Sequence, residues 1–394
     1  MSEGLSTVSL DELVELRPDK VASNKDPNLP YIGLEHIAQG QPRLLGTLPS
    51  SASVSINCYF SKDDILFGKL RPNLRKSLKA PFAGYCSTDI IVLRALDGVL
   101  PKYAAHVFQW ERVFAAASTT AVGTKMPRTS WNELRRYRVF KTDTDIEQSR
   151  IATVLDTVDE AIAKTEVVIA KLRQVRAGLL HDLLTRGLDA NGQLRDPITH
   201  PEQFRDSPLG FIPNDWEVTS LGEALSMQAG DALTSENISD MGTYPVYGGN
   251  GVRGFTTRYT HDGCYAIIGR QGALCGNIVL ASGKFFATEH AVVCTPVKKI
   301  SAGWLACYLS RMNLNRFSES SAQPGLSVQK ISHQQIALPK MEEQIAIESR
   351  LDAADESLNA EEIEIVKIKQ LKTGLMTDLL TGRVRVPLNT KGTS

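Results

Sequence analysis

The sequence lacks most of the signatures of an enzyme, a metal protein or a membrane protein. It has six cysteines but no C-x-x-C pair, so the ligand spacing of a structural zinc site is missing. No apolar run is long enough to span a bilayer and no signal peptide begins the chain. We therefore expect reduced thiols in a cytoplasmic protein. The 44 basic and 44 acidic side chains cancel, so the overall charge indicates neither nucleic acid nor membrane as a partner.

Catalytic motifs are also missing. There is no G-x-x-x-x-G-K-[ST] loop for ATP, and no [DNS]-P-P-[YF] tetrapeptide of the kind that amino-methyltransferases use on a flipped base. The seven histidines are scattered, without an H-x-x-x-H or H-E-x-x-H pair. The sequence predicts no catalytic residue and no metal site.

One motif does suggest a cofactor, because Gly249, Gly251 and Gly254 in "YPVYGGNGVRGF" spell G-x-G-x-x-G. A dinucleotide-binding turn needs a strand before the motif and a helix that begins at its third glycine. The preceding "MGTYPV" is too short and too interrupted by proline for a central strand, and the following "FTTRYTHDGCYAIIG" has no helical period. We interpret the glycines as a local loop in which the backbone approaches something closely.

Charge is sorted along the chain although it cancels overall. Residues 62–79 hold six basic and two acidic side chains, residues 125–141 hold six and one, and residues 250–330 hold nine and three. Residues 196–240 hold one basic and nine acidic side chains. This pattern is compatible with a groove that follows phosphates and equally with ordinary solvated faces.

The sequence contains an internal repeat. Residues 147–185 align without a gap with residues 343–381, and 17 of 39 positions are identical. Weaker matches precede them in the same order: "ILFGK" (65–69) with "AIIGR" (266–270), and "STDIIVL" (87–93) with "ATEHAVV" (287–293). Self-similarity in one order indicates a duplicated unit, so we expect a globular unit, a helix, a second globular unit and a second helix.

Both copies of the repeat carry a heptad pattern. Apolar residues recur with alternating steps of four and three over more than four heptads, which predicts a coiled coil rather than a surface helix. About 38 residues at ~1.5 Å each would make a rod of roughly 57 Å. The apolar positions of this seam are Ile151, Leu155, Val158, Ile162, Ile169, Leu172, Leu179, Leu183, Ile347, Leu351, Leu358, Ile365, Ile368, Leu375 and Leu379.

The polar members of the seam suggest how the two helices align. Thr165 and Arg176 occupy the same repeat positions as Glu361 and Lys372. If the helices pair with each other so that every seam residue meets another seam residue, Arg176 faces Glu361 and Lys372 faces Thr165. The alternative is that both basic side chains turn outward to solvent.

The remaining segments are rich in short β-type runs. Each unit also contains one expected helix, residues 101–117 and 301–317, whose aromatic positions Tyr103, Trp110, Trp304 and Tyr308 we expect to face a core. The connecting stretch 186–216 is rich in Gly, Pro, Asp and Asn and is a poor helix or strand former.

Taken together, these stretches resemble the DNA-specificity (S) subunits of type I restriction–modification systems. The resemblance covers almost the whole chain and depends on the order and duplication of its stretches. They are "DILFGKLRPNLRK", "CSTDIIVLR", "SPLGFIPNDWEV", "YPVYGGNGVRGF", "IIGRQGALCGNIVL", "FFATEHAVV", "EEQIAIESRLDAADESL" and "LKTGLMTDLLTGRV".

The resemblance implies an α+β fold with two similar β-rich target-recognition domains, separated by two long helices that form an antiparallel coiled coil with pseudo-two-fold symmetry. The implied segments are a first recognition domain (1–145), a first long helix (146–186), a linker (187–210), a second recognition domain (211–340), and a second long helix with a C-terminal tail (341–394).

The resemblance also implies a function. Each domain would read one half of a split, asymmetric sequence in double-stranded DNA, and the helices would set the spacing and dock two modification (M) subunits. The chain would be non-catalytic and hold no cofactor: S-adenosylmethionine would bind the M subunit, and ATP and Mg would bind the restriction (R) subunits of the full complex.

The residues expected to contact DNA are basic or amide side chains in Gly- or Pro-interrupted stretches, with one tyrosine. Arg commonly reads guanine, Asn or Gln reads adenine, and Lys mostly holds phosphate. In the first unit they are Lys69, Arg71, Asn73, Arg75 and Lys76, with Lys125 and Arg128 as secondary candidates. In the second unit they are Tyr247, Asn250, Arg253, Arg270, Gln271, Lys284 and Lys330.

Two other classes of protein stay open at this point. One is a single-chain enzyme that uses a nucleotide or S-adenosylmethionine, which would show cofactor binding by the purified chain. The other is a coiled-coil spacer between two protein-binding modules, which would not bind random duplex DNA with a steep salt dependence.

Overall fold

The computed structural model describes residues 7–17, 19–21, 26–53, 55–142, 144–272, 274–318 and 325–386. The chain divides into two compact units: unit 1 comprises residues 1–167 and 362–394, and unit 2 comprises residues 168–361. The end of the predicted C-terminal tail, beyond residue 386, lies outside the described residues. Within the described ranges, no helix combines the length and the apolar character needed to cross a membrane.

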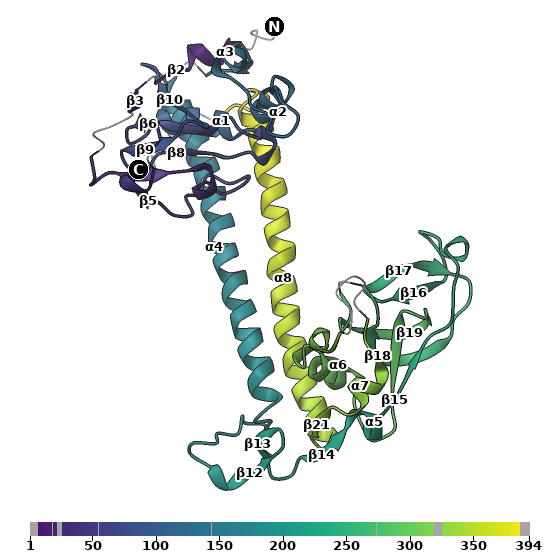
Figure 1. The fold of residues 1–394 in the computed structure, drawn as a ribbon. Helices are drawn as coiled ribbons and strands as arrows, with labels where there is room; N and C mark the ends of the chain where they lie inside the picture. The colour runs from purple at the N-terminus through teal and green to yellow at the C-terminus, as the bar shows by residue number, and fades with distance from the viewer. Residues whose placement is uncertain are drawn as a thin grey trace, which may run out of the picture. The chain divides into compact units, whose positions relative to one another are not determined.

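Unit 1 mixes short strands with short helices (Figure 1). Its sheets have the strand orders β1-β11, β2-β10-β7-β8 and β3-β6-β9-β4-β5. The strands are β1 (Thr7–Ser9), β2 (Val14–Leu16), β3 (Lys20–Val21), β4 (Pro30–Ile32), β5 (Leu48–Pro49), β6 (Asn57–Phe60), β7 (Ile65–Gly68), β8 (Ser77–Lys79), β9 (Gly84–Ser87), β10 (Ile90–Ala95) and β11 (Arg138–Phe140). The helices are α1 (Pro101–Gln109), α2 (Glu111–Thr119) and α3 (Trp131–Leu134).

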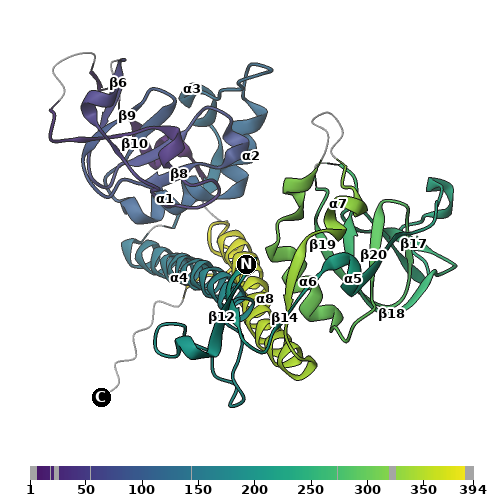
Figure 2. The same ribbon diagram turned by 60° about the horizontal axis from the view of Figure 1, so that its bottom comes forward.

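Unit 2 is built around one larger sheet with the strand order β15-β20-β18-β19-β16-β17. Figures 1 and 2 show α6 beside this sheet, where it packs on β18 and β19. The strands are β12 (Phe204–Ser207), β13 (Gly210–Pro213), β14 (Glu217–Ser220), β15 (Leu225–Ala229), β16 (Tyr244–Gly248), β17 (Gly251–Thr256), β18 (His261–Gly269), β19 (Ile278–Ala287), β20 (Ala291–Pro296) and β21 (Gln335–Leu338). The helices are α5 (Leu221–Ala224), α6 (Ala302–Arg311) and α7 (Val328–Ser332).

The two units share one set of strand pairings, taken in the same chain order. β10 lies between β2 and β7 in unit 1, and β20 lies between β15 and β18 in unit 2, all antiparallel. The first and last strands of each unit pair as well, β1 with β11 and β14 with β21. A parallel strand pair also recurs in both units, β4 with β9 and β16 with β19. The internal repeat of the sequence is therefore present in the fold.

The aromatic positions of the two expected short helices do face cores. Tyr103 and Trp304 are fully buried, and Trp110 and Tyr308 are 5% exposed. The length of these helices was predicted wrongly, because each expected helix is interrupted. Trp110 has an extended backbone (ψ 134°) that separates α1 from α2, and a left-handed Asn313 (φ 50°) follows α6. The apolar period continues through such a break, so it does not reveal the break.

The connecting stretch was also predicted wrongly as a poor strand former. It contains the hairpin β12–β13, closed by the pair Ser207↔Gly210. Gly210 has a φ of +91°, a conformation that glycine adopts without strain. Phe204 and Phe211 stack across the hairpin with ring centroids 5.2 Å apart. Composition alone hides such a hairpin, because turn residues outnumber the strand residues around them.

The two long helices predicted from the heptad pattern are present as α4 (Asp145–Leu183) and α8 (Met341–Leu379). Every apolar seam residue named above is buried or half-buried, and Leu155, Leu183, Ile347 and Leu351 are fully buried. Burial of one stripe, rather than of the whole circumference, is what a helix with a partner on one side requires.

Within unit 1 the two helices run antiparallel. Asp159 of α4 pairs with Lys372 of α8, and Glu166 of α4 pairs with Lys369 at 3.0 Å. Residue numbers therefore rise along α4 in the direction in which they fall along α8, from the pair 159–372 to the pair 166–369. Asp159 and Lys372 have side chains only 18% and 13% exposed, so this ion pair is better shielded from solvent than an ordinary surface pair.

Unit 2 repeats the ion pair at the equivalent positions, and the repetition corrects the expected alignment. The guanidinium of Arg176 donates to both carboxylate oxygens of Asp355, at 2.6 and 2.9 Å, instead of facing Glu361. Lys372 likewise does not face Thr165. Asp355 precedes Glu361 by six residues, about 9 Å of helix. A heptad seam specifies which face is buried but permits several axial alignments, and carboxylates outside the seam decide between them.

Each long helix begins with a buried glutamine that ties it to its own unit. The side-chain amide of Gln148 accepts a hydrogen bond from the backbone N–H of Leu100 at 2.8 Å and donates to the carbonyl of Gly98 at 3.0 Å. Gln344 accepts from the N–H of Ser301 in the same way, also at 2.8 Å. Both glutamines are fully buried, so these hydrogen bonds satisfy polar groups that would otherwise be costly to bury.

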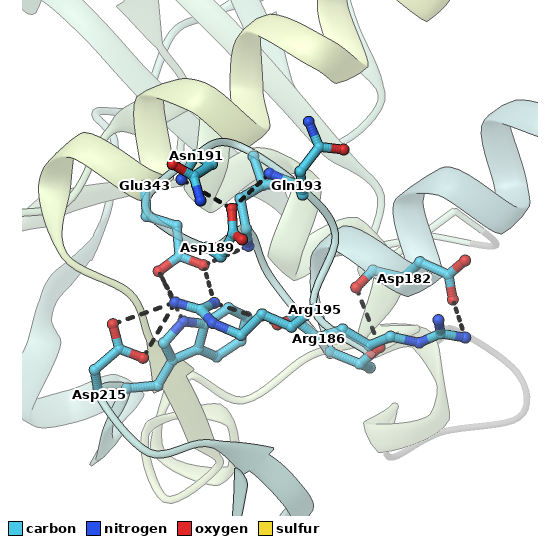
Figure 3. A network of polar contacts seen from close by, with 11 residues as sticks. Asp182, Arg186, Asp189, Asn191, Gln193, Arg195, Asp215 and Glu343 are labelled. Atoms are coloured by element: carbon cyan, nitrogen blue, oxygen red, sulfur yellow. Dashed lines mark hydrogen bonds and ion pairs between the residues drawn. The ribbon is translucent and has the colours of Figure 1, made fainter. Parts of the chain in front are cut away.

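The glutamate before each glutamine holds an arginine that follows the other long helix. Arg195 donates to Glu343 at 2.6 Å, and Figure 3 shows its guanidinium between the carboxylates of Glu343 and Asp215. In unit 1 Arg385 forms two hydrogen bonds of 2.7 Å with Glu147. The start of each helix is thus fixed to the segment beyond the end of the other.

Candidate nucleic-acid interface

The loop after β7 carries the first predicted set of DNA-contacting residues. Arg71 and Arg75 both have left-handed backbones, with φ of +51° and +49°, on either side of the short turn Pro72–Leu74. A left-handed conformation is uncommon outside glycine, and it persists only where surrounding contacts enforce it. The Arg75 carbonyl accepts from the N–H of Gly40 at 3.1 Å, so the loop is held on its far side as well.

The same loop is joined to the second predicted set by backbone hydrogen bonds. Leu70 and Arg128 form a β-bridge. The Arg71 N–H donates to the Pro127 carbonyl at 2.7 Å, and the Thr129 N–H donates to the Lys69 carbonyl at 3.1 Å. Residues 69–71 and 127–129 therefore form one surface, which brings the two sequence-predicted sets of unit 1 together.

The side chains of this surface differ in how far their charges are already satisfied. Arg128 forms hydrogen bonds of 2.9 and 3.4 Å with both carboxylate oxygens of Asp89, which raises the pKa of the guanidinium. Arg75 lies 3.5 Å from Glu111, and the Lys76 ammonium donates to a backbone carbonyl at 2.6 Å. These three side chains have structural partners within unit 1.

The other members of the set have no carboxylate ion-pair partner among the described residues. Lys125 is exposed, Lys69 is half-buried, and Arg71 is exposed, with its guanidinium donating to the Lys125 carbonyl at 3.3 Å. Asn73 is exposed between the two left-handed arginines. Positive charge that the protein does not neutralise is available for phosphate.

The glycine motif of unit 2 forms a β-hairpin. β16 and β17 are closed by the pair Gly248↔Gly251, with Gly249 and Asn250 at the turn. Gly251 has a φ of +88°. A side chain at Gly269 would lie 1.9 Å from the Gly249 carbonyl, so this turn packs on the end of β18 with backbone against backbone. β17 continues through Gly254 to Thr256, so no helix begins at the third glycine, which agrees with rejecting a dinucleotide-binding turn.

One part of that interpretation was wrong, because the segment before the glycines is an internal strand. β16 pairs with β17 on one side and with β19 on the other. Pro245 was expected to prevent this. Its missing N–H is tolerated because the parallel ladder to β19 involves only Val246 and Tyr247.

The structure brings Asn250, Arg270 and Gln271 close together. Gln271 forms a β-bridge with Gly325, and its carbonyl lies 3.2 Å from where a Cβ of Gly249 would be. The arrangement repeats that of unit 1: the segment after β18 bridges the segment before α7, as the segment after β7 bridges the segment before α3. Arg270 occupies the position of Lys69 in this comparison.

The remaining candidates of unit 2 are placed differently. Tyr247 is half-buried, with its ring 5.4 Å from that of Phe285, and belongs to an aromatic cluster. Arg253 is exposed on β17 beside the turn. The Lys284 ammonium lies 4.8 Å from the centre of the Tyr259 ring. Lys284 pairs with the start of β18, at the opposite end of that strand from Gly269. Lys330 lies in α7 and is exposed.

Sequence reasoning missed several residues that build these surfaces. Asp89 orients Arg128, and the backbone carbonyl of His290 accepts from the N–H of Arg270 at 2.9 Å. One carboxylate oxygen of Glu289 and Nδ1 of His290 are buried without a hydrogen-bond partner among the described residues. A signal existed, since these residues lie in the matched stretches "STDIIVL" and "ATEHAVV".

Comparisons with known proteins agree with these observations. Residues 213–370 match the family described as type I restriction modification DNA specificity domain. The EcoprrI specificity subunit of a type I restriction enzyme from Escherichia coli is 41% identical over 176 residues, which cover 43% of either chain. Over these residues the chain is similar to type I specificity subunits.

Other specificity subunits extend the similarity. The MjaVIII specificity subunit from Methanocaldococcus jannaschii is 25% identical over 267 residues, covering 61% of this chain and 60% of that relative. The chain thus matches between about two fifths and three fifths of the length of these relatives. A crystal structure of an S subunit from M. genitalium shares the fold, with a TM-score of 0.63 over 96% of this chain and 97% of that chain at 18% identity.

Proposed function

We propose that the chain is the DNA-reading specificity subunit of a type I restriction–modification complex. Unit 1 reads one half of a split, asymmetric target in double-stranded DNA, and unit 2 reads the other half. The chain performs no catalysis and holds no cofactor. Two M subunits supply S-adenosylmethionine and methylate adenine, and R subunits use ATP and Mg in the full complex.

The observation that supports this proposal most directly is the repetition of one basic surface in two units of one fold. Lys69 and Arg270 each follow the strand that pairs with the central strand β10 or β20, and each belongs to a segment bridged to a second loop. Two similar surfaces with different side chains are suited to read two different half-sites. Cations hold phosphates, and amide or guanidinium groups read base edges.

We further propose that α4 and α8 form the antiparallel coiled coil that sets the distance between the half-sites. The repeated ion pairs, Arg176 with Asp355 and Lys372 with Asp159, support a pseudo-two-fold arrangement. A rod near 57 Å, overlapped by its partner, can separate two readers by more than one turn of B-DNA, about 34 Å.

Exposed apolar residues on both helices support docking of two M subunits. Val167 and Val175 of α4 are 67% and 50% exposed, and the equivalent Ile363 and Leu371 of α8 are 58% and 56% exposed. Surface positions that stay apolar in both copies of a repeat indicate a shared protein contact. Two copies of one partner can bind to such pseudo-symmetric positions as they would to a symmetric dimer.

The test is to express the chain with its M partner and map methylated adenines in the cellular DNA. We expect one asymmetric sequence in two parts with a fixed gap. Deleting residues 163–169 together with 359–365, which removes one heptad at equivalent positions, should shorten the gap by about three base pairs and leave both halves unchanged. Methyl transfer or cofactor binding by the purified chain alone would contradict the proposal, as would DNA binding that is insensitive to salt.

A further inference from the structure

Unit 1 contains a short hairpin arm, residues 122–128, beside the basic loop. Val122 and Arg128 exchange two backbone hydrogen bonds of 2.9 and 3.0 Å, and Gly123 turns the chain with a φ of +108°. Arg128 also bridges Leu70 on its other side. The base of the arm is therefore fixed on both edges by backbone pairing, so the side chains of the arm are presented in a defined place.

The arm holds two exposed apolar side chains, one at its base and one in its loop. Val122 is 81% exposed and Met126 is 48% exposed. Keeping both side chains in water forgoes the free energy that burial of apolar surface provides. An arm that is well fixed but leaves such residues in water is suited to place them against something else.

The charges around these two apolar side chains indicate which kind of partner they contact. Lys69 and Arg71 lie beside the arm and Lys125 lies in its loop, and the three have no carboxylate ion-pair partner among the described residues. A polyanion that also offers apolar edges matches this combination. Duplex DNA has both, because its phosphates flank grooves in which thymine presents a methyl group.

We propose that Val122 and Met126 are specificity-determining residues that touch base edges in the half-site read by unit 1. The arm enters a groove with Lys69, Arg71 and Lys125 on the phosphates, and Val122 and Met126 lie against a thymine methyl group. Cytosine lacks the C5 methyl group that marks thymine, so an apolar contact at that point favours an A·T pair. This inference rests on the proposed function and adds a base class to it.

The test uses the complex of the full chain with its M partner and duplexes that carry the mapped target. The double variant Val122→Ala, Met126→Ala should lose about tenfold in discrimination at one or two adjacent positions of one half-site. The salt dependence of DNA binding by the double variant should not change. Replacing thymine by deoxyuridine at that position should weaken wild-type binding and leave the double variant unaffected, because only the methyl group is removed.

Two matched variants make the result specific. Leu45→Ala removes an apolar side chain that is 57% exposed elsewhere in unit 1, and it should change nothing. Lys125→Ala should lower the slope of log K against log salt by about 0.9 without relaxing any base preference. Both positions of the double variant are exposed, so circular dichroism should show an unchanged fold.

Three results would overturn the inference, and they are distinguishable. Unchanged base preference in the double variant, with normal salt-dependent binding, would show that Val122 and Met126 read no base although the chain binds DNA. If the double variant no longer co-purified with the M subunit, Val122 and Met126 would contact protein instead of DNA. Failure of the wild-type complex to bind any duplex in a salt-dependent way would remove the proposed function itself.

Discussion

Single residues show most clearly which parts of the candidate site a sequence can reveal. Basic and amide side chains in interrupted stretches can be picked out by type, and Lys69, Arg71 and Lys125 lie together as a set on one surface. The partner of Arg128 could not be picked out. Asp89 lies 39 positions earlier in the chain, and only the pairing of strands brings the two side chains together.

The ion pair between Glu147 and Arg385 could not be predicted from the sequence for the same reason, because only the fold brings the two side chains together. Arg385 is the principal cause of a lowered pKa at the Glu147 carboxyl. A carboxyl group whose pKa is lower in the folded state than in the unfolded state stabilises the fold above its unfolded pKa, and this contribution is lost as pH falls through the folded pKa. Glu147 is 1% exposed and Arg385 is 58% exposed, so the pair is only partly screened by solvent.

We therefore expect acid to destabilise the wild type more than an Arg385→Met variant. At neutral pH the variant should be less stable by about 1–2 kcal/mol, and the difference should shrink as pH falls below about 4.5, where unfolded glutamate is protonated. Urea unfolding at pH 7, 5 and 3 measures this. A difference that stays constant with pH would contradict the assignment. Lys367→Met, at a solvent-exposed pair with Glu364, is the matched control.

Cys58 offers a chemical readout near the basic surface of unit 1. It lies directly across the ladder from Cys86, between β6 and β9. A hydrogen bond from the Cys86 thiol, with Lys20 and Lys69 nearby, lowers the pKa of Cys58 to about 7. A thiolate is the reactive form of cysteine, so this residue should be alkylated at a pH where ordinary thiols react slowly.

The rate of iodoacetamide labelling at Cys58 should therefore rise with a midpoint near pH 7. Lys69→Ala should move the midpoint upward, because a positive charge that favours the thiolate is removed. Cys264, whose pKa is raised by burial, is the internal control and should label only at higher pH. Mass spectrometry of peptides separates the two sites. Equal midpoints at Cys58 and Cys264 would show that Cys86 and the nearby lysines do not lower the pKa of Cys58.

At the scale of elements, the long helices were the most predictable part and their alignment the least. The heptad pattern specifies a buried stripe, and α4 and α8 bury it. The alignment depends on Asp159 and Asp355, which lie outside the apolar seam and cannot be told from other surface carboxylates by pattern alone. The strand at Tyr244–Gly248 was missed for a similar reason, because the harmless position of Pro245 becomes visible only once the ladder is known.

The pairing of Arg176 with Asp355 can be tested by exchanging the charges. Arg176→Asp or Asp355→Arg alone places like charges together and should destabilise the chain by about 1 kcal/mol, since both side chains are roughly one-third exposed. The double exchange should recover most of that loss. Thermal unfolding of the four proteins gives the coupling energy. Additive losses in the double variant would show that the two side chains do not interact, and the alignment of the helices would need revision.

At the scale of the whole molecule, the duplication was the most informative feature. It predicted two units of one topology from sequence alone, since 17 identities in the helices point to shared ancestry of the flanking segments as well. The units differ where the proposed reading surfaces lie. Unit 1 has the arm of residues 122–128 and unit 2 has the glycine turn at Gly249–Asn250. The internal repeat reveals the scaffold that the two units share. It does not reveal which side chains contact a given half-site.

The salt dependence of DNA binding separates the cations that are available from those already paired. Replacing Lys69, Arg71 and Lys125 together by alanine should reduce the slope of log K against log salt by about 0.9 for each phosphate that is no longer neutralised, close to three in total. Replacing Arg75 and Lys76 should reduce it less per residue, because Glu111 and the Leu34 carbonyl already engage their side chains. Fluorescence anisotropy with a random duplex, using the complex with M, measures both. Equal reductions per residue would mean that the internal partners are exchanged for phosphate on binding, and an unchanged slope in the triple variant would place the DNA elsewhere on unit 1.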